Sequence, residues 1–73
     1  MRGHEVEHVA VRSIVGPWGE IEVVVQQSSD RRYYAVLKQP PPSLMAVVGT
    51  AADDEDEAVA MLRLECLRAL GGL

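Results

Sequence analysis

The stretch TAADDEDEAVAMLRLECLRAL, residues 50–70, decides the fold because it carries the clearest long helical pattern in the chain. At 100° per residue, its apolar side chains fall within about one third of the circumference of a helix, which makes an amphipathic stripe. The members of this stripe are Ala58, Val59, Leu62, Cys66, Ala69 and Leu70. A stripe of this width has to cover an apolar surface, so the helix predicts a second layer built from the rest of the chain.

The residues before the helix are rich in valine and alternate as β-strands do. We expect strands at about 5–15, 20–27, 32–38 and 43–49, and a helix at about 52–70. Residues 16–19 (Gly-Pro-Trp-Gly) supply turn chemistry, and the three prolines at 40–42 end the third strand. The predicted fold is α+β: a single domain, residues 1–73, with a three- or four-stranded antiparallel sheet and one C-terminal helix packed on one face.

Composition limits what this chain can be. It has 73 residues and no phenylalanine, so one small aliphatic core is expected, and a partner or a second copy would add burial. A single cysteine excludes an internal disulfide, and no apolar run approaches the ~20 residues of a membrane span. With no signal-peptide pattern at the N-terminus, we expect a cytoplasmic protein. The net charge of −4 argues against direct nucleic-acid binding.

Charge is distributed unevenly along the chain. An unbroken acidic run precedes the apolar turns of the helix, and it consists of Asp53, Asp54, Glu55, Asp56 and Glu57. This run has two readings. It either stabilises the positive end of the helix dipole, with Thr50 or Asp54 as the N-cap, or it forms a patch that steers the protein toward a basic partner.

Three further side chains are candidates for partner contact. Trp18 lies at a turn tip, where it either folds back to close one end of the core or anchors a partner. Arg31 and Arg32 lie in the polar connection before the third strand, beside Tyr33 and Tyr34. Adjacent strand residues point to opposite faces, so one tyrosine is expected in the core and the other on the surface.

The helix carries a second apolar strip, formed by Ala60, Leu64 and Leu67. A helix on one small sheet needs only one stripe. Either the helix is deeply cradled and both strips are core, or Leu64 and Leu67 form a seam that a second copy or another protein buries. We favour the second reading, because so small a core gains from added burial.

Catalytic signals are weak. His4-Glu5-Val6-Glu7-His8 matches the letters of the zinc-protease pattern H-E-x-x-H, but it runs into a strand pattern. On a strand, the two histidines would be separated by roughly 13 Å, too far to share one ion. Cys66 lies on the core stripe with no group placed to activate it. We therefore expect neither enzyme activity nor a bound metal or cofactor.

From Asp30 onward, the order of elements resembles the HicB-like antitoxin fold. The aromatic-led stretch 33–37, the proline-interrupted connection, the strand closing in Gly49-Thr50 and the acidic helix start at Glu57-Ala58 carry this resemblance. Members of that family pair with a small RNA-cleaving toxin and block it, which implies an inhibitor. The long N-terminal strand and the triple proline depart from the family pattern.

In size and acidity, the chain is also similar to the small phage-encoded anti-CRISPR inhibitors. Both resemblances imply a non-enzymatic protein that occupies a basic surface of a nucleic-acid-handling partner. The alternative is a structural module that assembles with itself as a homodimer.

Overall fold

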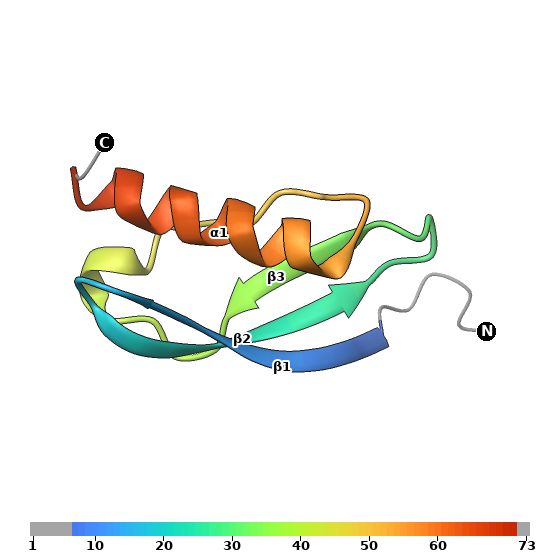
Figure 1. Cartoon of the computed structure of the whole chain (residues 1–73), viewed down its shortest axis with the longest axis horizontal. Helices are drawn as coiled ribbons and strands as arrows, with labels where there is room; N and C mark the ends of the chain where they lie inside the picture. Colours follow the sequence, from blue (N-terminus) through green and yellow to red (C-terminus); the bar gives the residue numbers. More distant parts are fainter. Residues whose placement is uncertain (1–6, 72–73) are drawn as a thin grey trace.

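A long β-hairpin forms the base of the molecule. The computed structural model describes residues 7–71, in which strand β1 (Glu7–Gly16) pairs antiparallel with strand β2 (Gly19–Gln27) (Figure 1). Pro17 fixes φ at the first position of the connecting turn. Gly19 adopts a φ of 91°, which only glycine reaches without strain, and this closes the hairpin.

A third strand completes the sheet. Strand β3 (Tyr33–Leu37) pairs antiparallel with β2, so the strand order is β1-β2-β3. The far edge of β3 is joined to the segment before the helix by two hydrogen bonds of 2.9 Å, one in each direction between Tyr33 and Ala52. Within residues 7–71 the sheet therefore has three strands, the smaller of the two numbers expected from the sequence.

Helix α1 (Glu55–Ala69) lies across one face of this sheet, so the molecule has two layers (Figure 1). Side chains alternate along each strand, and one set from every strand points toward α1. Val23 and Val25 of β2 and Leu62 of α1 are fully buried between the layers. The α+β fold predicted from the sequence is confirmed. The buried core comprises Ile14, Ile21, Val23, Val25, Ala35, Leu37, Leu44, Ala52, Ala58, Val59, Leu62 and Cys66.

The strand predicted at 43–49 is wrong. A short 3₁₀ helix, η1 (Pro42–Leu44), stands there, followed by a turn and an irregular segment. Proline is tolerated in the first turn of a helix, where its missing N–H needs no partner. The turn carries Leu44 into the core, whereas Ala46 and Val48 are exposed, so the expected alternation over this segment is not realised.

The helical stripe is confirmed over most of its length. Ala58, Val59, Leu62 and Cys66 are buried, but Ala69 and Leu70 are exposed. Ala69 is the last residue of α1 and borders an open cleft that Ser43 and residues 46–48 also line. Beyond it, Gly71 ends the helix with a left-handed φ of 74°.

Candidate functional site

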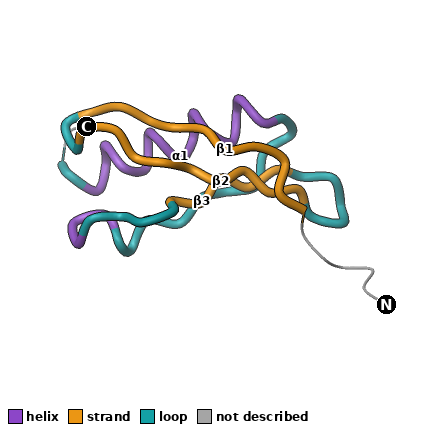
Figure 2. The backbone as a smooth tube through the Cα atoms, turned by 90° about the horizontal axis from the view of Figure 1, so that it is seen from below, coloured by secondary structure: helices purple, strands orange, loops and turns teal. Residues whose placement is uncertain are grey.

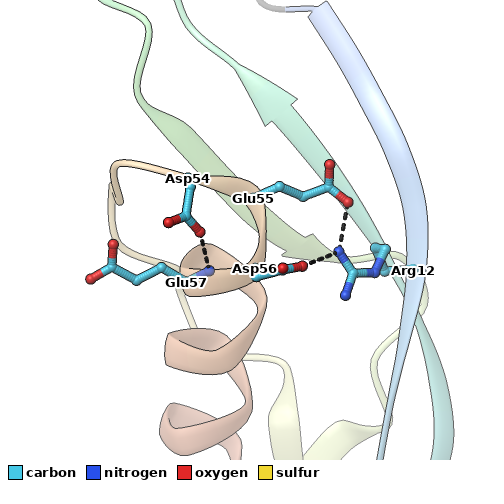
Figure 3. Close-up of polar contacts among 5 residues, drawn as sticks. All are labelled: Arg12, Asp54, Glu55, Asp56 and Glu57. Atoms are coloured by element: carbon cyan, nitrogen blue, oxygen red, sulfur yellow. Dashed lines mark hydrogen bonds and ion pairs between the residues drawn. The ribbon is translucent and has the colours of Figure 1, made fainter.

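The acidic run forms the N-terminus of α1. Asp54 is the N-cap, and its carboxylate accepts a hydrogen bond of 2.7 Å from the backbone N–H of Glu57 (Figure 3). The Glu57 side chain in turn accepts from the backbone N–H of Asp53 at 3.4 Å. Of the two N-caps considered from the sequence, the structure uses Asp54 and leaves Thr50 in the preceding segment.

Arg12 connects the sheet to this acidic helix start. Its Nη1 donates to Glu55 Oε2 at 2.6 Å and to Asp56 Oδ1 at 2.9 Å (Figure 3). Both hydrogen bonds raise the pKa of the Arg12 guanidinium, and the bond to Glu55 has the larger effect. The sequence analysis missed Arg12 because its partners lie more than forty residues away. No local signal marked Arg12, because the sequence of β1 does not fix which of its faces meets α1.

The two arginines expected at a partner surface lie in the β2–β3 connection. Arg32 donates from Nη2 to the carbonyl oxygen of Ala51 at 3.2 Å, and its Nε lies 3.7 Å from Asp53 Oδ1. Arg31 adopts a left-handed φ of 67° and its backbone N–H donates to Ser28 O at 2.9 Å. Arg32 therefore contacts the acidic run through Asp53, whereas Arg31 contributes its backbone to the β2–β3 turn.

The same connection is ordered by Asp30. Its carboxylate accepts hydrogen bonds from Ser28 Oγ and from the backbone N–H of Arg32. Both hydrogen bonds lower the pKa of the Asp30 carboxyl, and the bond from Ser28 has the larger effect. The Asp30 carboxylate therefore holds this turn through hydrogen bonds to residues of the turn itself.

Most of the acidic run stays exposed, although each of its five carboxylates makes one of these internal contacts. Five carboxylates face two guanidinium groups, those of Arg12 and Arg32, so the helix start keeps an excess of negative charge. The side chains of Asp53 and Asp56 are both 86% exposed. The run therefore caps and anchors α1, and it presents carboxylates to solvent. Its steering toward a basic partner stays a prediction.

Trp18 folds back onto its own hairpin. Its indole Nε1 donates to the carbonyl oxygen of Ile14 at 3.3 Å, and the half-buried ring packs against the core. A Cβ added to Gly16 would clash with this ring, so the glycine makes room for it. Of the two expectations for Trp18, the structure matches closure of one end of the core.

Apolar side chains remain exposed on α1. Leu64 is 46% exposed and Leu67 is half-buried. Arg63, which neighbours Leu64 on α1, donates from Nε to the carbonyl oxygen of Val15 at 3.0 Å, so its long side chain spans the two layers. The second apolar strip is thus not fully incorporated into the core.

A second exposed apolar surface lies on the opposite layer. Val11, Val24 and Val36 are paired in register across β1, β2 and β3, on the sheet face that α1 does not cover. Val11 is 60% exposed and Val36 is 46% exposed. We call these three residues the valine row. The sequence alone does not align these valines, because the register between the strands follows only from the folded sheet.

An open cleft of about 480 Å³ adjoins this surface at β3. Its walls come from the outer side of β2 and β3 and from residues 47–49. Tyr34 borders the cleft, while Tyr33 packs against the core, so the two adjacent tyrosines point to opposite faces as expected.

Cys66 is fully buried. Burial raises the pKa of its thiol, and the negative charge of Glu65 adds a smaller effect in the same direction. No group of three or more His, Cys, Asp or Glu side chains in the described part of the chain is placed to hold a metal ion. His8 lies in β1, and His4 and Glu5 lie outside the described residues.

No helix within residues 7–71 is both long enough and apolar enough to cross a bilayer. Compared with known proteins, this chain matches no family model, no curated protein and no solved structure.

Proposed function

We propose that this chain is a non-enzymatic protein-binding module that acts as an inhibitor, with its acidic helix start directed at a basic surface of a nucleic-acid-handling partner. The resemblance to HicB-like antitoxins and the similarity to anti-CRISPR proteins suggested this class. One observation carries the proposal. Asp53 and Asp56 stay 86% exposed although arginines lie beside both of them.

Electrostatics explains why these carboxylates suit a basic partner. Like charges gathered at one end of a small molecule raise the rate of encounter with a surface of opposite sign. The partner's phosphate-binding lysines and arginines would form such a surface. Arg12 and Arg32 hold the acidic segment in place from the sheet side, so the exposed carboxylates are presented in one arrangement.

The test first isolates a partner from the source cells by capture on the immobilised chain. The rate of association between that partner and the chain is then measured. In the variant Asp53→Asn/Asp56→Asn, Asp54 is retained because it caps α1. We expect a severalfold lower association rate and a weaker dependence of that rate on salt. The control Glu20→Gln/Glu65→Gln removes the same charge elsewhere and should bind as the parent does. Equal rates for both variants would contradict the electrostatic proposal.

A self-assembling module is the second candidate, favoured by the exposure of Leu64. In this reading Leu64 and Leu67 meet the same residues of a second copy along α1. Sedimentation of the variant Leu64→Lys distinguishes the readings, because a lysine at the centre of such a seam would prevent dimerisation.

A further inference from the structure

The valine row lies on the sheet face opposite α1, and residues 47–49 border it only at β3. Figure 2 looks at the molecule from the sheet side, with α1 behind the strands. Three β-branched side chains cross all strands in one line, and the exposed Val15 lies further along β1 on the same face. Contiguous exposed apolar surface rimmed by polar residues is typical of protein–protein contact sites.

Both edges of the sheet are poorly suited to pairing with another strand. On β1, a bulge lies between His8 and Ala10, and Arg12 is a charged residue on the inner side of the strand. Both features are known to blunt an edge strand. On β3, the bonds between Tyr33 and Ala52 occupy one end of the edge, and the segment around residue 49 lies close beside the strand. Association through the face is therefore favoured over association through an edge.

The polar residues beside the valine row are arranged in a way that suits a copy of themselves. One step along the strands on one side, Glu22 and Lys38 are paired in register, with 3.5 Å between Lys38 Nζ and Glu22 Oε1. One step on the other side, Gln26 and Tyr34 are paired in register. The row thus separates an ion pair from a pair of uncharged hydrogen-bonding side chains.

We propose that the valine row is the contact surface of a homodimer in which two sheets pack face to face about a two-fold axis that runs along the row. This axis places Glu22 and Lys38 of each copy over Gln26 and Tyr34 of the other, where the charged groups meet hydrogen-bonding partners. An axis along the strands would instead place Glu22 opposite Glu22, and like charges repel. The contact is isologous, as expected of a dimer with closed symmetry.

The size of the surface sets the strength of this dimer. Strands of 10, 9 and 5 residues, at about 3.4 Å per residue and about 4.8 Å between strands, cover about 400 Å². A stable interface buries about 800 Å² on each partner. The dimer is therefore of the weak class, smaller than a standard stable interface.

This dimer uses the sheet layer and leaves the acidic helix start free. It is independent of the proposed inhibitory function, since Asp53 and Asp56 belong to the start of α1 and the valine row does not include them. Either proposal can fail while the other holds.

Sedimentation equilibrium from about 1 µM to about 1 mM tests the dimer over the range in which weak complexes form. The design compares Val36→Lys with Leu64→Lys, because both native side chains are 46% exposed but lie on opposite layers. We expect the parent and Leu64→Lys to shift from monomer to dimer with equal midpoints. Val36→Lys should weaken association at least about tenfold, because the contact would bury an unpaired charge. Circular dichroism confirms that each variant is folded.

A parent that stays monomeric over the whole range would overturn the proposal. So would dissociation by Leu64→Lys with Val36→Lys unaffected, which would assign the seam to α1, or a dimer indifferent to both changes. Isotope-filtered NMR on a mixed labelled sample then tests the axis. We expect intermolecular contacts between the Tyr34 ring and the Lys38 side chain, whereas contacts between Val11 and Val36 would contradict the axis along the row.

Discussion

At the scale of single residues, the carboxylates of the acidic run do different work although they look alike in the sequence. Asp54 satisfies a backbone N–H at the start of α1, and Glu55 and Asp56 hold the Arg12 guanidinium. Asp53 and Asp56 keep exposed oxygens. A substitution in this run will therefore affect stability or charge depending on its position.

The change Asp54→Ala should lower the free energy of unfolding by about 1 kcal/mol, because it removes the N-cap acceptor of the Glu57 N–H. Urea denaturation followed by circular dichroism measures this. Asp53→Ala is the matched control: it removes the same charge one residue earlier, and its exposed carboxylate caps nothing, so a change within about 0.5 kcal/mol is expected. Equal losses in the two variants would show that charge, and not capping, stabilises the helix start.

The residue scale also marks the limit of what the sequence could predict about the site. The dipole and capping reading of the acidic run follows from local spacing, and the structure selects Asp54 from the two N-caps considered. Arg12 could not be assigned, since its role depends on which face of β1 meets α1. The position of Trp18 depended in the same way on a contact with Ile14 and Gly16, which only the folded hairpin creates.

At the scale of elements, periodicity was a reliable guide wherever a segment is long and one of its faces is buried. The alternation in 20–27 and the helical stripe in 58–66 both correspond to buried faces of β2 and α1. The segment 43–49 shows why the same reasoning fails for a short apolar run. There Leu44 satisfies its burial from a 3₁₀ turn, so alternation in the sequence says nothing about the backbone.

The segment between η1 and α1 is positioned by a close approach to β3. A Cβ added to Gly49 would clash with the backbone carbonyl oxygen of Ala35, which has no room to move within a paired strand. Gly49→Ala should therefore push the segment away from the sheet and lower the free energy of unfolding by about 1–3 kcal/mol.

Hydrogen exchange localises this effect. In Gly49→Ala, the amides of Tyr33 and Ala52 should exchange faster than the rest of the sheet, because the bridge between them holds the displaced segment. Thr50→Ala is the matched control, since Thr50 is the next residue in the chain, is exposed, and does not cap the helix. Protection that is unchanged at both amides in Gly49→Ala would contradict the close approach.

At the scale of the whole molecule, two layers divide the surface into two kinds of contact site. The helix layer begins with exposed carboxylates, and the sheet layer presents the valine row. A protein with a charged surface on one layer and an apolar surface on the other can bind a different partner on each. The apolar sheet face is left exposed because the single helix covers only the other face of the sheet.

A core of this size also makes the whole fold sensitive to single buried side chains. At about 0.05–0.15 kcal/mol per residue, a chain of 73 residues has a free energy of unfolding of about 4–11 kcal/mol. Leu44 is fully buried although it comes from a three-residue 3₁₀ helix in the connection between sheet and α1. Leu44→Ala should cost about 2–5 kcal/mol, the range for a fully buried leucine.

That loss is a large part of the total, so Leu44→Ala should unfold at a markedly lower urea concentration. Trp18 is the sole tryptophan and packs against the core at the hairpin end, so its fluorescence reports whether the whole molecule unfolds in one step. Met45→Ala is the neighbouring control: Met45 is 70% exposed, and a change within about 0.5 kcal/mol is expected. If the two variants unfolded at the same urea concentration, η1 would be a surface connection, and the core would be complete without it.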